Sequence, residues 1–306
     1  MARSNPYLLY RAASRAAMAV PDGAALPLAR ALGTAAWVVL PARRALVARH
    51  QARVSHRRPP PPGASSAASR RAARAAFASY GRYWMESLRL PAITAEAVDA
   101  GFSIEGQDHL EEARHAGNGA VLALPHLGGW DVGGSWLARQ GFDVSVVVEA
   151  LEPPELFEWF VGLRQTFGLS VIPLGSGAGT AVLGALRANH MVCLLCDRDI
   201  SGGGIEVDFF GERTALPAGP VTLALRARSV VLPTAVYFDG KGHHAVVRPP
   251  LPTDRRGTIR EDVARITQDL ARAHEELIAR APEQWHLFQP NWPSDDPTTT
   301  RRFDER

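Results

Sequence analysis

Cysteine is scarce in this sequence. The two cysteines, Cys193 and Cys196, lie in "CLLC" inside an apolar, strand-like run. Residues three apart on a strand face opposite sides of a sheet, and no further ligands stand at the spacing of a zinc site. We therefore predict two buried free thiols in a reducing compartment, and no metal centre.

Long apolar runs are missing as well. The run from Ala31 to Ala42 has about 12 residues, well short of the roughly 20 that a transmembrane helix needs. Arg11, Arg15 and Arg30 also interrupt the single apolar block that a secretory signal would show. The sequence therefore predicts neither a membrane span nor a secretory signal in this segment.

Acidic residues are nearly absent from the first part of the chain. Residues 1–85 contain fourteen Arg and one acid, Asp22, which leaves 20 basic and 30 acidic residues for the remainder. Helices with apolar and arginine-bearing faces lie in the interface of anionic membranes, although an ordinary helical pair packed on the core has the same pattern. Nucleic acid also binds basic segments, but no recognised nucleic-acid motif accompanies this one. We predict that residues 1–95 are amphipathic helices on an anionic membrane surface, peripheral at the cytoplasmic face of the plasma membrane, with no nucleic-acid partner.

The pattern changes after residue 95, where apolar runs alternate with helix-like segments. Continuous Val, Leu and Ile runs separated by helices predict an α/β fold, with a mostly parallel central sheet flanked by helices. The expected strands are 119–126, 144–150, 169–174, 191–197, 230–238 and 243–250, and the expected helices are 129–140, 153–167, 178–189 and 258–280. The predicted α/β core spans 96–292, with a loop at 57–71 and a flexible tail at 293–306.

A histidine and an aspartate stand where the first of these strands ends. His126 follows "GAVLALP", and Asp131 comes after four intervening residues, at the start of the next helix. Ligands of such sheets bind at the carboxyl ends of the strands. A carboxylate on one ring nitrogen would fix the tautomer and leave the other nitrogen as a base, and the "GG" between the two residues offers amides for an oxyanion. A purely structural histidine beside an N-terminal aspartate is the alternative.

Other chemistries have weaker support. No G-x-S-x-G elbow occurs, which argues against a covalent serine mechanism. "LGSGAGT" at 174–180 has Thr180 where a dinucleotide fingerprint requires its last glycine. A metal-dependent hydrolase would need ligands from His126, Asp131, Asp197 and Asp199, which form no recognised spacing.

Two further groups of charged residues lie near the same edge. The stretch "CDRDISGGGIEVDFFGERTALPAGP" carries Asp197, Arg198, Asp199 and Glu206 just past a buried strand. A solvated loop would have the same composition. Glu149 ends another strand, and Arg164 lies on the helix after it. These two residues could form a structural ion pair or position an anionic headgroup.

Taken in order, these motifs resemble a known family. H-x4-D at His126 and Asp131, the strand followed by "DRD", then "GIEVDFFGERTALPAGP" and "PEQWHLFQPNW" are similar to the bacterial late-acyltransferase branch of the lysophospholipid acyltransferase superfamily. The resemblance covers about residues 75–292. Asp131 stands where the lipid A enzymes mostly carry Glu, so the pattern is nearest to the actinobacterial phosphatidylinositol mannoside branch.

The resemblance implies acyl transfer, for example of palmitoyl, from acyl-CoA to a mannose hydroxyl of a phosphatidylinositol mannoside. His126 would be the general base, with no covalent intermediate and no cofactor beyond acyl-CoA as co-substrate. The alternatives are a lipid A-type or lysophospholipid acyltransferase, or a non-catalytic glycolipid-binding protein. The partner of His126 stays open among Asp131, Asp197, Asp199 and Glu206. The substrate-binding residues implied are Glu149, Arg164, Arg198 and His286.

Overall fold

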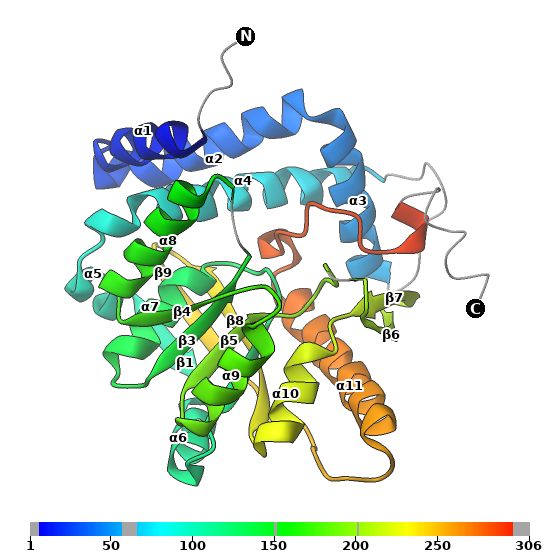
Figure 1. Cartoon of the computed structure of the whole chain (residues 1–306). Helices are drawn as coiled ribbons and strands as arrows, with labels where there is room; N and C mark the ends of the chain where they lie inside the picture. The colour runs from blue at the N-terminus through cyan, green and yellow to red at the C-terminus, as the bar shows by residue number, and fades with distance from the viewer. Residues whose placement is uncertain (1–5, 57–65, 150–151, 201, 296–306) are drawn as a thin grey trace.

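A computed structural model describes residues 6–56, 66–149, 152–200 and 202–295 (Figure 1). Its helices are α1 (Pro6–Met18), α2 (Asp22–Val39), α3 (Pro41–His56), α4 (Ala67–Arg89), α5 (Ala95–Ala100), α6 (Gln107–Ala116), α7 (Trp130–Arg139), α8 (Pro154–Thr166), α9 (Ala178–Arg187), α10 (Gly219–Ala227) and α11 (Ile259–Arg280). Its strands are β1 (Phe102–Glu105), β2 (Ala120–Leu124), β3 (Val144–Val148), β4 (Leu169–Pro173), β5 (Met191–Leu195), β6 (Ile205–Phe209), β7 (Glu212–Leu216), β8 (Val230–Asp239) and β9 (Gly242–Val247).

The core is a seven-stranded sheet in the order β1-β9-β8-β2-β5-β3-β4. The five strands from β8 to β4 run parallel, whereas β9 folds back antiparallel on β8 and β1 runs parallel to β9. All five residues of β2, "AVLAL", are buried, as expected for a central strand covered on both faces. The predicted α/β fold with a mostly parallel sheet is confirmed.

Helices cover both faces of the sheet. The apolar residues of α6 and α7 pack on the face that carries Leu122 and Leu124. The helices α9 and α10, with Leu270 of α11, pack on the face that carries Val121 and Ala123. The alternation of side chains along β2 therefore feeds two separate apolar clusters.

The helices α1 and α2 lie above the carboxyl ends of the parallel strands, with α4 between them and the sheet, whereas α3 descends at the side (Figure 1). The helices α2 and α4 approach closely at two glycines. A Cβ at Gly33 would lie 2.1 Å from the Phe77 carbonyl oxygen, and one at Gly81 would lie 2.2 Å from that of Ala29. No single helix of the described residues is long and apolar enough to cross a bilayer, although the α2–α3 pair, bent by 105°, passes that test of length and composition together.

The C-terminal segment corrects the predicted tail boundary. Asp295 is fully buried and pairs with His50 at 2.8 Å and with Arg53 at 3.1 Å, both on α3. Arg53 is itself buried, and its guanidinium lies 4.3 Å from the Trp292 ring centroid. Residues 293–295 are thus held by buried ion pairs with α3, which is too far away in the sequence for a local pattern to reveal. Residues 296–306 lie outside the described residues.

Two other sequence-based expectations also change. Of the loop predicted at 57–71, residues 57–65 lie outside the described residues, but α4 already begins at Ala67 with Ser66 as its N-cap. The later part of the charged stretch, where the sequence predicted no strand, forms a β6–β7 hairpin, whose turn places Phe210 and Gly211 at positive φ. Backbone pairing therefore orders residues whose polar composition suggested a loop.

The buried Asp295 cluster gives a stability prediction. Burial by itself raises the pKa of Asp295, but the hydrogen bond and charge of His50 and the charge of Arg53 outweigh it and hold that pKa well below its usual value. Asp295→Asn should lower the free energy of unfolding at pH 7 by about 3 kcal/mol, because it removes the buried carboxylate that pairs with His50 and leaves buried Arg53 with Glu212 alone as charge partner. Urea unfolding would measure this loss.

An exposed ion pair provides the matched control. Asp254→Asn removes a partner of Arg256, where both side chains are more than half exposed, and should cost no more than about 1 kcal/mol. Because the folded pKa of Asp295 is depressed, its contribution is present above the unfolded pKa of about 3.9 and is lost as the pH falls below it. Equal losses in both variants, or a wild-type advantage that persists undiminished at low pH, would contradict the assignment.

Candidate active site

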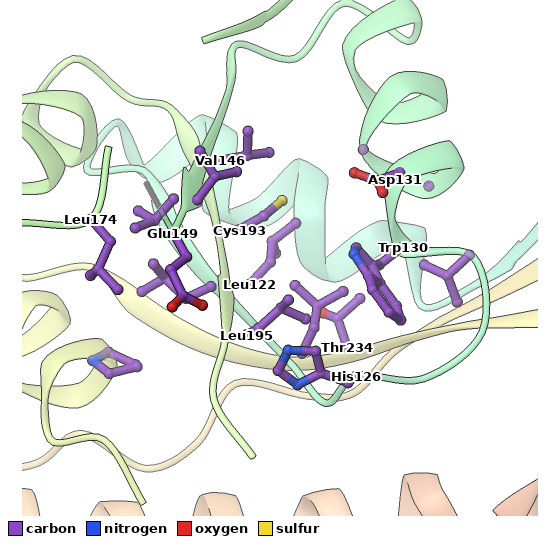
Figure 2. Close-up of a pocket in the computed structure, with 18 of the residues that line it drawn as sticks. Leu122, His126, Trp130, Asp131, Val146, Glu149, Leu174, Cys193, Leu195 and Thr234 are labelled. Atoms are coloured by element: carbon purple, nitrogen blue, oxygen red, sulfur yellow. The ribbon is translucent and has the colours of Figure 1, made fainter. Parts of the chain in front are cut away.

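A cavity of about 800 Å³ opens at the carboxyl ends of the parallel strands. Its deep part is apolar and lies between the sheet and α7, where Leu122, Cys193 and Trp136 contribute to the walls. Its outer part carries the polar residues His126, Asp131 and Glu149 among the side chains drawn in Figure 2. An apolar chain with a polar reacting end would match this division.

His126 owes its partner to the pairing of β2 with β5. These strands are parallel neighbours in a register that places Leu124 opposite Leu195. His126 and Asp197 each stand two residues beyond those positions. His126 Nδ1 lies 2.6 Å from Asp197 Oδ1, and the His126 backbone N–H donates to Asp197 Oδ2 at 3.0 Å.

Asp197 is fully buried and ionised. Burial by itself raises the pKa of Asp197, but the charge and hydrogen bonds of His126 and the Trp285 N–H outweigh it and hold that pKa far below its usual value. A permanent carboxylate at Nδ1 fixes the proton on that nitrogen. The His126 side chain is 24% exposed and lines the cavity, so Nε2 is the nitrogen available for proton transfer there.

Asp131, the nearest carboxylate in sequence, is not the partner of His126. Asp131 Oδ1 instead accepts from Arg164 at 2.8 Å, and Asp131 Oδ2 accepts from the Tyr83 hydroxyl at 3.2 Å. Trp130 lies between Asp131 and His126 (Figure 2) and stacks on Tyr83 at 4.3 Å. Of the acids left open as partners of His126, Asp131 is directed elsewhere, because the helix that begins at Trp130 turns its carboxylate toward Tyr83 of α4 and Arg164 of α8.

The two glycine amides expected to serve an oxyanion are already occupied. Gly128 N–H donates to the Gln284 carbonyl, and Gly129 N–H donates to the Val236 carbonyl, both at 2.9 Å. Gly128 has φ +64°, and a Cβ there would lie 2.0 Å from the Val236 oxygen. The "GG" is thus required by close backbone packing under the turn.

The remaining predicted acids have different surroundings. Asp199 lines the cavity and accepts from Gly204 N–H at 2.8 Å. Glu149 also lines the cavity and is exposed at its mouth, away from Asp131 (Figure 2). Glu149 therefore does not form the ion pair with Arg164 that the sequence allowed. Glu206 lies on the hairpin, half exposed and paired with Arg213 at 2.7 Å. Its position argues against a role beside His126.

Two buried nitrogens at the cavity have spare hydrogen-bonding capacity. Within the described residues, Arg198 Nε and His286 Nδ1 have no hydrogen-bond partner. His286 Nε2 lies 2.9 Å from the Ser79 hydroxyl. Burial, with a smaller contribution from the His126 charge, lowers the pKa of His286 to about 3, so this ring is neutral near pH 7. Buried polar atoms that lack partners commonly mark positions that a ligand satisfies.

Sequence reasoning missed Trp285 and Tyr83. Trp285 lies inside the quoted "PEQWHLFQPNW", and its indole N–H donates to Asp197 Oδ2 at 2.7 Å. Tyr83 stands on a helix that precedes the sheet by some twenty residues of sequence, which gives no spacing signal toward Asp131.

Both cysteines are free, as predicted. Cys193 packs with the cluster under α7, and Cys196 packs with the cluster on the opposite face. Burial raises the pKa of Cys193 to about 12, so its thiol stays protonated at the cavity wall and is a poor nucleophile. Among the residues with described positions, no three His, Cys, Asp or Glu side chains gather where they could hold a metal ion.

The model of the bacterial lipid A biosynthesis acyltransferase family matches residues 7–294. The chain belongs to this family. It is 42% identical over 226 residues to a phosphatidylinositol mannoside acyltransferase of Mycobacterium tuberculosis (strain ATCC 25618 / H37Rv), a match that covers 72% of this chain and 70% of the relative. These matches confirm the late-acyltransferase family and the phosphatidylinositol mannoside branch that the motifs resemble.

Two further relatives extend the comparison. A phosphatidylinositol mannoside acyltransferase of Mycolicibacterium smegmatis is 40% identical over 225 residues, covering 72% of each chain. A lipid A biosynthesis acyltransferase of Haemophilus influenzae is 25% identical over 186 residues, covering 59% of this chain and 55% of the relative.

The paired geometry gives a prediction that separates Asp197 from the other acids. Asp197→Asn should lower kcat about 10³-fold, because the amide no longer fixes the Nδ1–H tautomer or stabilises the imidazolium. Glu206→Gln, the matched control on the exposed hairpin, should keep kcat within about twofold. Steady-state kinetics on both variants, with melting temperatures to verify folding, would measure this. A Glu206→Gln defect as large as that of Asp197→Asn would reverse the assignment.

Proposed function

We propose that this protein transfers a fatty acyl group from acyl-CoA to a mannose hydroxyl of a phosphatidylinositol mannoside. The observation that carries the proposal is the His126–Asp197 pair at the junction of a polar mouth and a deep apolar cavity. The substrate class comes from the names of the mycobacterial relatives at 40–42% identity. The acyl donor, acyl-CoA, is the one that the resemblance to the late-acyltransferase family implies.

The proposed reaction uses direct attack. His126 Nε2 takes the proton from the mannose hydroxyl while the hydroxyl oxygen forms a bond to the thioester carbonyl carbon. The tetrahedral intermediate collapses as the carbon–sulfur bond breaks, and the imidazolium returns its proton to the departing thiolate. The products are the mannose ester and free CoA. Asp197 stabilises the imidazolium between the two transfers.

Arg198 and His286 supply the unpaired hydrogen-bonding groups of the site, because the Gly128 and Gly129 amides are already bonded to backbone carbonyls. In the proposal, Arg198 Nε donates to the developing oxyanion, where a positive charge in a partly dry cavity is most effective. Neutral His286 uses Nδ1 to hydrogen-bond the acceptor without competing for its proton. Glu149, Arg164 and Asp199 lie around the mouth, where sugar hydroxyls and the headgroup would bind.

The apolar part of the cavity is proposed to hold the acyl chain. Its walls come from strand residues such as Leu122, Val146 and Val236, and from α7. Gly133 and Gly134 of α7 also line it, and a Cβ at Gly133 would lie 2.6 Å from the Val236 side chain. Glycine weakens a helix interior, so its use here fits a requirement for space between helix and sheet.

The first two helices are proposed to rest on an anionic membrane at its cytoplasmic face. Large apolar side chains are exposed along them: Leu8, Leu9, Met18, Leu28, Leu32, Val38 and Val39. Exposed arginines of these two helices are Arg15 and Arg30. Apolar and basic side chains on one pair of helices favour peripheral binding to anionic headgroups, which would bring the glycolipid to the cavity.

The activity is tested by supplying palmitoyl-CoA with phosphatidylinositol mannoside and following the acylated product by mass spectrometry. Wild type should form a mannose ester with one free CoA per product, and His126→Ala should lose at least about 10³-fold in kcat. His115→Ala, an exposed histidine of α6, is the control and should retain full rate.

Alternative acceptors decide the substrate class. If a lysophospholipid or a lipid A precursor were acylated faster than the mannoside, the proposed acceptor would be wrong. The role of His126 as base would still stand. Binding of the mannoside without consumption of any thioester would instead indicate a glycolipid-binding protein. Near-normal turnover by His126→Ala would exclude the proposed base.

The membrane surface is tested with the exposed side chains alone, because α3 holds the C-terminal segment and its deletion would disturb the fold. Leu32→Gln with Val39→Gln should weaken binding to anionic vesicles about tenfold, since each loses exposed apolar surface, while activity on detergent-dispersed substrate is kept. Ile259→Gln changes an exposed apolar residue of α11 and serves as control.

Sedimentation with vesicles at low and high salt would also show the screening expected of arginines. Unchanged binding would assign these helices a purely structural role.

A further inference from the structure

Three consecutive C-terminal residues form a ladder with the catalytic turn. Gly128 N–H donates to the Gln284 carbonyl at 2.9 Å, and His286 N–H donates to the His126 carbonyl at 2.7 Å. Between them, Leu127 and Trp285 form an antiparallel bridge. The turn that carries His126 is therefore fixed by a segment almost 160 residues further along the chain.

Trp285 adds a side-chain contact to this ladder. Its indole N–H donates to Asp197 Oδ2 at 2.7 Å, and the same oxygen accepts the His126 backbone N–H at 3.0 Å. Asp197 Oδ1 then faces His126 Nδ1 at 2.6 Å. With Oδ2 held by two donors, the carboxylate has a single orientation.

Packing fixes the indole itself. Trp285 is 1% exposed, and the rings of Phe210 and Trp292 lie 5.7 and 6.1 Å from it. It does not line the cavity with His126. Its influence on the reaction must therefore pass through Asp197.

Two other titratable groups near Asp197, His274 and Cys196, are neutral near pH 7. Burial lowers the pKa of His274, whose Nε2 lies 3.2 Å from the Ala123 carbonyl. Burial and the charge of Asp197 raise the pKa of Cys196 well above its usual value. Arg198, the next residue in the chain, is charged at every pH of interest. A change in the hydrogen bonding of Asp197 is thus transmitted chiefly to His126.

We propose that Trp285 is a positioning residue of the acyl transfer, which orients Asp197 and sets the pH range in which His126 accepts a proton. This inference rests on the proposed role of His126 as base. The Trp285 N–H draws negative charge toward Oδ2. Without it, Oδ1 becomes a stronger acceptor and holds the imidazolium more tightly, so that His126 releases its proton less readily.

Trp285→Phe removes the N–H and keeps an aromatic ring. We expect kcat at pH 7 to fall by about tenfold, the consequence of one lost hydrogen bond to a charged group. The acid limb of the kcat profile should move to higher pH, so the deficit shrinks as the pH rises. KM should change by less than about twofold, because Trp285 does not line the cavity.

Trp292→Phe is the matched control. Trp292 is 3% exposed in the same cluster, and its indole N–H donates to the Phe209 carbonyl at 3.1 Å. This variant loses a comparable indole ring and hydrogen bond without removing a side-chain contact of His126 or Asp197. Its pH profile should therefore coincide with that of wild type. An unshifted profile for Trp285→Phe, or equal shifts in both variants, would overturn the proposal.

A measurement on the wild-type protein covers the case in which Trp285→Phe does not fold or no acyl transfer is detected. In an NMR titration, the Trp285 indole proton resonance should move together with the titration of the His126 ring, through their shared carboxylate, while that of Trp292 stays in place. No movement of the Trp285 resonance would reject its role independently of any activity. Coupled movement in a protein without acyl transfer would keep the positioning role and reject the proposed reaction.

Discussion

The pairing of β2 with β5 is the constraint on which the site depends. These parallel strands are neighbours at the centre of the sheet, and their register places His126 and Asp197 side by side beyond the two strand ends. Such strands must be apolar on both faces, and β2 is buried throughout. The sheet that forms the core therefore also brings His126 to the carboxylate of Asp197.

Burial of the Asp197 carboxylate also requires hydrogen-bond donors around it. A charge without water must be satisfied by several donors, and Asp197 obtains them from the His126 backbone, the His126 ring and Trp285. The donors come from the turn itself and from the C-terminal segment. The site is thus built from three distant parts of the sequence around one buried charge.

The C-terminal segment also connects the site with the N-terminal helices. Gln51 of α3 donates to the Pro282 carbonyl at 2.7 Å, and His50 Nδ1 lies 3.0 Å from the Leu287 carbonyl. The buried Asp295 cluster holds the end of the same segment to α3. The helix α3 therefore supports the C-terminal segment that holds the turn carrying His126.

From the sequence we could predict the α/β class, most strands of the parallel sheet and the two free cysteines, and we could select His126 and the later charged stretch as candidate positions. These follow from local patterns, because continuous apolar runs and strand ends are properties of short segments. The three-dimensional arrangement was needed to show that Asp197 and not Asp131 faces His126, that the Gly128 and Gly129 amides are occupied, and that the Trp285 indole donates to Asp197. Each of these depends on strand order, on register or on a contact between distant segments, and sequence proximity favoured Asp131 because it carries no information about which strands become neighbours.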